Sequence, residues 1–296
     1  MNKLDLKNFV EQNPHLVSRR LVGNDIYILK YKKRVFFDDL WNEYLEECRG
    51  TIVDADFNVV QRPFTKIYNY GVEKKAPTLA PETTVDAYRK VNGFMVAITW
   101  HNNDLLVSTT GSTDSDFVAM ARELIDAERY SKVCKEWHNT TFMFECVHKN
   151  DPHIIPEQEG MYLLGYRGKT WDSNTAPDAK ILRMLEIEFD TIPVEHYRMR
   201  MDSLLQEVKS VRHEGFVFYT DDGVSAKIKP PYYLASKWVA RNPRTNKLVD
   251  MRNDIKKNLD EEYYPLVDAI RANITEYTAM DEQARLAWCR KFLETV

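Results

Sequence analysis

Lys90-Val91-Asn92-Gly93 is the stretch that decides the fold of this chain, because other chemically distinctive fragments follow it in a consistent order. They are Phe142-Met143-Phe144-Glu145, Met161 to Tyr166, Glu214-Gly215-Phe216-Val217-Phe218 and Ala226-Lys227-Ile228-Lys229. A single Lys-x-Asn-Gly arises easily by chance at ordinary residue usage, but the ordered set does not. The set combines one lysine at a turn, two carboxylates on apolar strands and a closing pair of lysines, which predicts a single site assembled from distant segments.

Bulk properties limit the classes of protein to consider. A chain of 296 residues is long enough for one large domain with a small appendage. The net charge of -4 is not that of a protein that coats nucleic acid, so any contact with a polynucleotide must use a local basic surface. Candidates are Arg19-Arg20, Lys30 to Arg34, Arg198 with Arg200, and Arg241 to Lys247, although each is more often a solvated face.

Targeting signals and cysteines favour one compartment. No apolar run is long enough to span a membrane, and the N-terminus lacks the apolar centre of a signal peptide. The cysteines (Cys48, Cys134, Cys146 and Cys289) are scattered, without a Cys-x-x-Cys pair, which argues against structural zinc and gives no disulfide framework. We therefore expect a cytoplasmic protein with reduced thiols, in the host cytoplasm if the chain is encoded by a phage.

Hydrophobic periodicity predicts strands with helices between them up to about residue 240, followed by helices. Helices are expected at 4–12, 38–48, 115–130 and 253–278, with a shorter one around Leu286, Cys289 and Leu293. Strands are expected at 25–31, 51–53, 58–61, 141–147, 161–166, 214–220 and 224–229, with two or three more within 83–110. The polar stretch Asn242-Pro243-Arg244 predicts a boundary between a domain at 1–242 and a small helical domain at 243–296.

Lys90 is the candidate nucleophile. A lysine is almost fully protonated at pH 7, so an attacking lysine needs burial or neighbouring cations to lower its pKa. Lys227, Lys229 and a divalent cation could provide that field. Gly93 allows the backbone to approach a ligand closely, and Asn92 can fix the turn or the ligand. Taken alone, the fragment favours an exposed lysine that enters a hairpin.

Two carboxylates and two lysines supply the remaining chemistry. Glu145 lies in an apolar strand, where a carboxylate is costly without a partner, and ribose hydroxyls would provide one. Glu214 precedes another apolar run and suits a magnesium ion, which prefers oxygen ligands. Lys227 and Lys229 point the same way from one strand, which favours an anion such as a triphosphate. The alternatives are a strand-edge carboxylate, a turn acid and lysines that protect an edge strand.

Two upstream cations extend the candidate site. Arg49, in Cys48-Arg49-Gly50, has the fork geometry to bind a phosphate. Lys66, in Pro63-Phe64-Thr65-Lys66, could contact phosphates or the purine site. Each is more often a surface ion-pair partner. The histidines have no metal-ligand spacing, and no Gly-rich phosphate loop is present.

Together these fragments resemble the covalent nucleotidyltransferase superfamily of polynucleotide ligases and capping enzymes, and more narrowly the RNA ligase 1 family of tailed phages. The resemblance covers roughly residues 25–240. It implies an α+β adenylation domain with mostly antiparallel sheets, followed by a small all-helical C-terminal region. It also implies ATP and Mg²⁺ as cofactors, with Mn²⁺ as an alternative metal.

The resemblance assigns roles to individual residues. It implies that Lys90 accepts AMP from ATP, that AMP moves to an RNA 5'-phosphate, and that a 3'-hydroxyl then seals the bond. Glu145 would hold the ribose, Glu214 a metal ion, and Lys227 and Lys229 the phosphates. The nucleotide-binding set implied by the family is Arg49, Lys66, Lys90, Asn92, Gly93, Glu145, Lys227, Lys229 and Tyr233, the last with its neighbour Tyr232 as a competing alignment. The expected partner is RNA with 5'-phosphate and 3'-hydroxyl ends, broken tRNA included, bound by a monomer.

Three departures from the family pattern bear on this interpretation. Asn92 stands where many relatives have Asp. The segment Thr109-Thr110-Gly111 lacks a lysine associated with this stretch. The tail is short and helical, which disfavours a DNA ligase or capping enzyme with an appended OB-fold. Two alternatives are a nick-sealing ligase acting on duplexes or DNA and a non-catalytic module that binds nucleotide or RNA.

Overall fold

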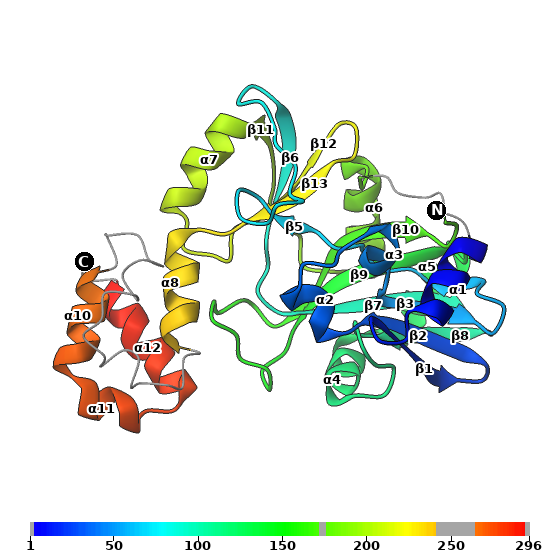
Figure 1. Cartoon of the computed structure of the whole chain (residues 1–296), viewed down its shortest axis with the longest axis horizontal. Coiled ribbons are helices and arrows are strands. Elements are labelled where there is room, and N and C mark those ends of the chain that lie inside the picture. Colours follow the sequence, from blue (N-terminus) through cyan, green and yellow to red (C-terminus); the bar gives the residue numbers. More distant parts are fainter. Residues whose placement is uncertain (1–2, 172–175, 241–263, 294–296) are drawn as a thin grey trace.

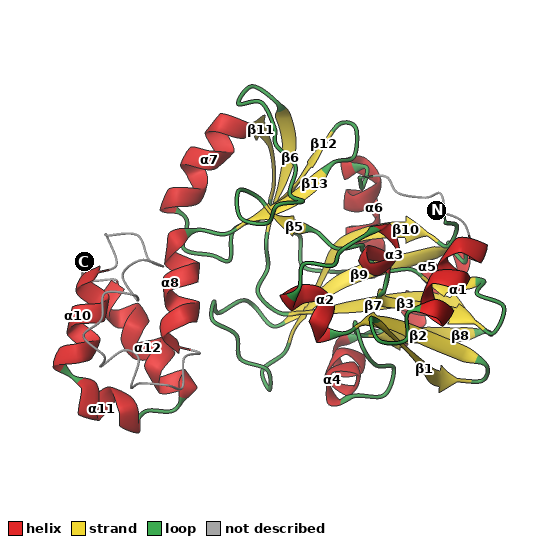
Figure 2. Cartoon of the chain, viewed as in Figure 1, coloured by secondary structure: helices red, strands yellow, loops and turns green. Residues whose placement is uncertain are grey.

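The structure is a computed structural model that describes residues 3–171, 176–240 and 264–293. Three sheets form the N-terminal part, and helices cover them, while a group of helices lies at the C-terminal end (Figures 1 and 2). The described strands are β1 (Val17–Gly23), β2 (Ile26–Tyr31), β3 (Arg49–Asp54), β4 (Val59–Gln61), β5 (Tyr68–Asn69), β6 (Thr84–Arg89), β7 (Phe94–His101), β8 (Asp104–Ser108), β9 (Thr140–Val147), β10 (Gly160–Gly168), β11 (His196–Arg200), β12 (Phe216–Thr220) and β13 (Ser225–Ile228). The expected α+β fold with mostly antiparallel sheets is confirmed.

The helices occupy the intervals between strands and the C-terminal end. They are α1 (Lys3–Gln12), α2 (Lys33–Phe37), α3 (Glu43–Glu47), α4 (Asp116–Leu124), α5 (Ala127–Glu136), α6 (Ala179–Phe189), α7 (Met201–Ser210), α8 (Pro231–Ala240), α10 (Tyr264–Ala272), α11 (Ile274–Ala279) and α12 (Glu282–Leu293). None of the described helices is long and apolar enough to cross a membrane. All four cysteines are free and buried, as the absence of a disulfide framework predicts.

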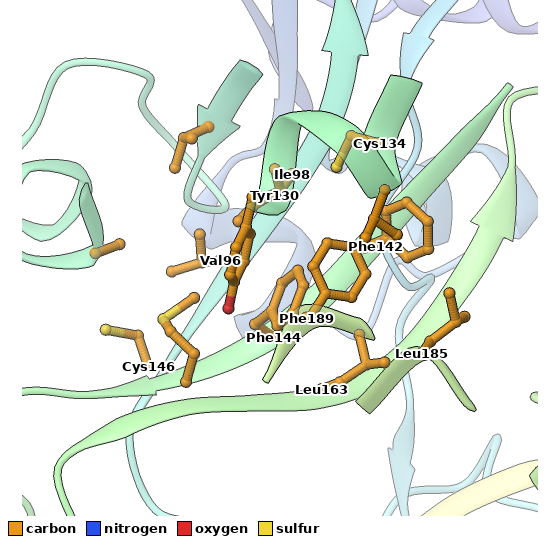
Figure 3. Packing of buried hydrophobic residues seen from close by; sticks show 14 of the residues in the cluster. Val96, Ile98, Tyr130, Cys134, Phe142, Phe144, Cys146, Leu163, Leu185 and Phe189 are labelled. Carbon is orange, nitrogen blue, oxygen red and sulfur yellow. The ribbon is translucent and has the colours of Figure 1, made fainter. Parts of the chain in front are cut away.

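The sheets have the orders β1-β2-β3-β4, β10-β9-β7-β8 and β11-β6-β12-β13-β5. Within them every strand pair is antiparallel except β13 with β5. The second sheet packs against α5 and α6 through an aromatic cluster, which Figure 3 shows around Tyr130, Phe142, Phe144 and Phe189. The Phe142 and Phe189 rings meet edge to face, with centroids 4.9 Å apart, an arrangement that favours a rigid layer.

Two expected helices differ from the periodicity, because one is shorter and the other is divided into two. The helix expected at 38–48 is limited to α3, because Asp39 adopts a left-handed φ of 50° and Asn42 caps the helix start through its side chain. The helix expected at 115–130 is two helices, because the Asp126 side chain accepts a hydrogen bond from the Arg129 amide at 3.0 Å and starts a new helix. In each case a capping side chain starts a new helix within a continuous hydrophobic pattern.

The register of the third sheet places several cavity-lining side chains on one face. Tyr88 of β6 pairs with Val217 of β12, and Val217 pairs with Lys227 of β13. Residues that lie directly opposite one another in neighbouring strands point to the same face, and so do residues two apart. Tyr88, Val217 and Lys227 therefore lie side by side on one face, with Lys90 directly after β6 on the same side.

The C-terminal helices have their own small core, formed by Leu266, Val267, Ile270, Tyr277 and Cys289, and Ala235 of α8 joins it. The prediction of one continuous helix at 253–278 is wrong for residues 264–278, because α10 ends at Ala272 and α11 starts at Ile274. The Asn273 side chain donates to the Ala269 carbonyl at 2.9 Å, which competes with the helical ladder. Residues 253–263 and the expected boundary at 242–244 lie outside the described residues.

A buried ion cluster joins the first sheet to the second. Glu47, at the end of α3, accepts hydrogen bonds from Arg62, which follows β4, and from Arg167 of β10. The relative exposures of these residues are only 6%, 1% and 6%. Although burial raises the pKa of Glu47, the two guanidinium groups outweigh it and hold that pKa below its usual value.

We expect Glu47→Gln to lower the free energy of unfolding by about 3–5 kcal/mol, because it removes the buried carboxylate charge that both guanidinium groups bind. Urea denaturation followed by circular dichroism measures the effect. Glu43→Gln is the matched control, since Glu43 lies exposed on the same helix. Equal urea midpoints for the two variants would show that the cluster contributes no net stability.

Candidate functional site

A cavity of about 160 Å³ opens between the second and third sheets. Its walls come from strands of both sheets and from the segment after β4. The lining residues are Arg49, Phe64, Thr65, Ile67, Tyr88, Arg89, Lys90, Val91, Met95, Glu145, Leu163, Leu164, Val194, Val217, Tyr219 and Lys227. The cavity thus combines an extensive apolar wall with a few charged groups.

Arg49 and Lys227 are the unbalanced cations of this cavity. Neither side chain makes an ion pair or hydrogen bond within the described ranges 3–171, 176–240 and 264–293. Burial, and then neighbouring cations with Arg49 first among them, lower the pKa of Lys227 to about 7. Burial also lowers the pKa of Arg49. Two partly desolvated cations facing one cavity form a site for an anion.

Lys90 lies next to this pair and is held by Glu214. Its ammonium is 3.0 Å from Glu214 Oε2, and its backbone amide donates to the Gly215 carbonyl at 2.8 Å. The other oxygen of Glu214 accepts from Lys229 at 2.8 Å. The turn at Gly215 allows this approach, because its φ is +113° and a Cβ there would lie 2.0 Å from the Ile228 carbonyl oxygen.

The charges around Lys90 overturn one expectation. Burial lowers the pKa of Lys90, but Glu145 and Glu214 outweigh burial and raise that pKa above its usual value. The same ion pairs lower the pKa of Glu214 to about 2, against the opposing effect of its burial. The prediction that nearby lysines depress the pKa of Lys90 is therefore wrong for the nucleotide-free protein. The positive charge of Lys229 is balanced by its own ion pair with Glu214.

Glu145 lies on the cavity wall and binds the turn after Lys90. One of its oxygens accepts a hydrogen bond from the Gly93 amide at 3.0 Å. Burial is the main cause that raises its pKa above the usual value. A Cβ at position 93 would lie 2.3 Å from the Cys146 carbonyl oxygen, so Gly93 is required by its contact with β9. The structure therefore explains Gly93 by backbone packing, whereas the sequence suggested that it allows a close approach to a ligand.

Asn92 has a fixed orientation. Its Nδ2 donates to Glu214 Oε2 at 2.6 Å, and its Oδ1 accepts from the Ile155 amide at 2.9 Å. A carboxamide provides both a donor and an acceptor, whereas an ionised carboxylate would face Glu214 with like charge. Asn92 therefore connects Glu214 to the 148–159 loop, and Glu157 of that loop binds Arg89 at 2.8 Å.

Six predicted site residues lie outside the cavity lining, namely Lys66, Asn92, Gly93, Glu214, Lys229 and Tyr233. Lys66 pairs with Glu73 and lies over the rings of Trp41 and Tyr68, at 4.6 and 4.5 Å from their centroids. Tyr233 of α8 is buried, and its ring centroid lies 4.7 Å from the Lys229 ammonium. The lining residues are held in place by contacts with Asn92, Gly93, Glu214 and Lys229. Lys66 instead lies over the aromatic rings of Trp41 and Tyr68.

Sequence reasoning missed most of the apolar wall and Tyr88. The Tyr88 hydroxyl is buried and has no hydrogen-bond partner within the part of the chain that is described. Burial raises the pKa of Tyr88 to about 12. Strand periodicity could have found this residue, because it lies two positions before Lys90 and so shares its face. Leu163 and Leu164 belong to a fragment that the sequence singled out without a role.

No group of three or more His, Cys, Asp or Glu side chains suited to a metal ion occurs among the described residues. Glu214 is the carboxylate predicted for a metal, and its Oε2 lies 3.0 Å from the Lys90 ammonium. Mg²⁺ commonly binds through one or two carboxylates together with the phosphates of its substrate. Glu214 beside Lys90 fits such a metal.

Comparisons with known proteins agree with this geometry. A family model described as RNA ligase matches residues 47–233. An archaeal ATP-dependent RNA ligase superposes with a TM-score of 0.60 at 15% identity, over 95% of this chain and 75% of that one. A putative ATP-dependent DNA ligase from Aquifex aeolicus superposes with a TM-score of 0.56 at 15% identity, over 94% and 72% of the two chains. No curated protein matches the sequence.

Proposed function

This chain belongs to the RNA ligase family, and we propose that it is ATP-dependent and joins 5'-phosphate and 3'-hydroxyl RNA ends through a lysyl-AMP intermediate on Lys90. The observation that carries the proposal is the position of the Lys90 amine. It lies on the wall of a cavity that has two unpaired cations, Arg49 and Lys227, and an extensive apolar surface. An amine in that position is within reach of a nucleotide phosphate.

The cavity has a complementary partner for each part of ATP. Arg49 and Lys227 would bind the phosphates, since both cations lack a counter-charge. Leu163, Leu164 and Val217 offer an apolar surface to the base. The buried Tyr88 hydroxyl would gain a hydrogen-bond partner from a bound nucleotide. Glu145, in the lining beside Lys90, would hold the ribose.

The proposed chemistry has three balanced steps. The Lys90 ammonium first gives a proton to water, and the neutral amine attacks the α-phosphorus of ATP. A P–N bond forms, the nitrogen loses a second proton to water, and the bond from the α-phosphorus to the bridging oxygen breaks with release of pyrophosphate. An oxygen of the RNA 5'-phosphate then attacks the same phosphorus, and the P–N bond breaks as lysine recovers a proton. Finally the 3'-hydroxyl loses its proton to water as its oxygen bonds to the RNA 5'-phosphorus, and the bond from that phosphorus to AMP breaks, so that AMP leaves.

The protein contributes mainly position and charge, as phosphoryl transfer requires. Glu214 holds the Lys90 ammonium in place before the nucleotide arrives, and this ion pair must open for the amine to attack. Lys229 stays within 2.8 Å of Glu214 and can balance its charge when Lys90 departs. Glu214 would hold Mg²⁺, or Mn²⁺ in its place, which when bound would neutralise phosphate charge.

The test is covalent labelling of the wild-type protein. Protein freed of bound AMP is incubated with ATP labelled at the α-phosphate and with Mg²⁺, and then separated under denaturing conditions. We expect a labelled protein that loses its label on addition of pyrophosphate, and that transfers it to single-stranded RNA bearing a 5'-phosphate. Absence of label would overturn the lysyl-AMP mechanism and favour a nucleotide-binding module.

The same labelled protein addresses the substrate. We propose single-stranded or broken RNA ends, tRNA included, acted on by a monomer in the cytoplasm. Ligation of a single-stranded RNA is compared with ligation of nicked RNA and DNA duplexes at equal concentrations of ends. Faster sealing of the nicked duplexes would overturn the single-strand preference and leave the adenylation step intact.

A further inference from the structure

Helix α2 presents two aromatic side chains to solvent. Phe36 and Phe37 have relative exposures of 57% and 75%, and their rings meet edge to face with centroids 5.7 Å apart. Val35, which is fully buried, anchors the short helix to the first sheet. Single exposed apolar residues are ordinary, but two adjacent exposed phenylalanines on one turn favour a binding surface.

The charges next to these rings are mainly positive. Lys30, Lys32 and Lys33 are exposed, and none forms an ion pair within the described residues. Arg34 is already paired with Asp38 at 2.9 Å, which leaves Asp39 as the acidic group within 30–40 that opposes the three lysines. We call Lys32, Lys33, Phe36 and Phe37 the α2 surface.

The α2 surface lies close to the phosphate-binding end of the cavity. Lys30 pairs with Arg49 across β2 and β3, and Arg49 lines the cavity. Tyr31, which follows Lys30, packs edge to face against Trp41 at 4.6 Å, and Trp41 in turn covers the Lys66 ammonium. In Figure 1, α2 lies on the side of the N-terminal sheets that is nearer to the C-terminal helices.

We propose that the α2 surface binds the single-stranded RNA that adjoins the end being joined. Bases would stack on Phe36 and Phe37, while Lys32 and Lys33 contact the phosphates. Exposed aromatic rings beside cations are the arrangement that single-stranded nucleic acids use, because every base has a face that stacks and every linkage has a negative charge. This proposal rests on the proposed function, since it names where that RNA lies.

A second copy of the chain is the competing occupant of this surface. A symmetric contact would place Lys32 and Lys33 of one copy against the same surface of its partner, and like charges at the centre of an interface disfavour it. A polyanion meets no such repulsion. The charge pattern therefore favours RNA over self-association.

The experiment compares Phe36→Ala/Phe37→Ala with the wild type. We expect the affinity for a 5'-phosphorylated single-stranded RNA, measured by fluorescence anisotropy, to fall at least about tenfold, since each stacked base contributes about 1–3 kcal/mol. Covalent labelling by ATP should not change, because α2 does not line the cavity. Ile187→Ala is the matched control, because Ile187 is 65% exposed on α6.

Lysine substitutions and oligomeric state complete the test. Lys32→Ala/Lys33→Ala should flatten the slope of log affinity against log salt by about 1.4, the value for two lost single-strand phosphate contacts. Undiminished RNA affinity in the phenylalanine variant, or no RNA binding by the wild type, overturns the proposal. A change in sedimentation of that variant would instead assign the surface to self-association. A wild type that binds RNA through α2 but takes no label from ATP would refute the catalytic mechanism alone.

Discussion

Lys90→Ala is expected to reduce covalent labelling by α-labelled ATP to background. The substitution removes the amine that lies on the cavity wall, and no side chain that could replace it as nucleophile is in the same position. Lys227 also lines the cavity, but it lies on β13, two strands away from β6 in the third sheet. The fold should survive, because Glu214 keeps its hydrogen bonds with Asn92 and Lys229.

Lys90→Arg separates the chemistry of the residue from its charge. A guanidinium group can still pair with Glu214, but it stays protonated and does not act as a nucleophile. We therefore expect Lys90→Arg to bind ATP, measured by calorimetry, and to take no label. Lys132→Ala, an exposed lysine on α5, is the matched control and should label normally. Label that persists in Lys90→Ala, or that maps to another lysine, would refute the assignment of the nucleophile.

The parts of the fold that the sequence predicted are those with short-range patterns. Strands β9, β12 and β13 follow the expected segments because their apolar runs are bounded by turns and polar residues. The breaks before α3 and between α4 and α5 were not predicted, because single capping residues such as Asn42 and Asp126 decide them. Strand β11 and helices α6 and α7 were also missed.

The sequence indicated several residues that the structure places near one another, but it did not indicate which groups their charges contact. Residue types and their order were enough to single out Lys90, Glu145, Glu214 and Lys227, which the structure gathers around one cavity or next to it. The partner of each charge depends on contacts between distant segments, such as the Asn92 side chain with the Ile155 amide. No local pattern encodes such a contact. The raised pKa of Lys90 likewise depends on Glu145 and Glu214, which come from segments distant in the sequence.

Lys227→Met is expected to weaken ATP binding by about 10–100-fold, the loss of a charge-assisted contact worth about 1.5–3 kcal/mol. Calorimetry in the Lys90→Arg background measures this without a covalent step. In the free protein Lys227 has a pKa of about 7, so at pH 8 it is mostly neutral. Phosphates bound beside it would favour the ammonium form, and the last phosphate proton of ATP is already lost at that pH.

Binding of ATP at pH 8 should therefore take up close to one proton, and the uptake should disappear in Lys227→Met. Titrations in buffers of different ionisation enthalpy measure it directly. The affinity of the parent protein should fall as the pH rises above 7, because charging Lys227 then becomes more costly. Proton uptake that is the same in both proteins would show that Lys227 does not contact the phosphates.

The stability of the nucleotide-free protein tests the role of Lys227 independently of ATP binding. The pKa of Lys227 falls from about 10.5 in the unfolded chain to about 7 in the folded protein. The folded state therefore loses stability as the pH drops through this interval, and carries the whole penalty below it. Lys227→Met should thus raise the urea midpoint of the nucleotide-free protein at pH 7.

Lys229→Met is the matched comparison, because Lys229 lies two positions after Lys227 and directly after β13. Lys229 is an ion-pair partner of the buried Glu214, so its removal should lower the urea midpoint. Opposite changes from two neighbouring lysines would mean that Lys227 is kept for its ligand at the expense of stability, while Lys229 holds the site together. Destabilisation by both substitutions would instead mean that Lys227 has a counter-charge in solution, and its role as a free cation for phosphate would be lost.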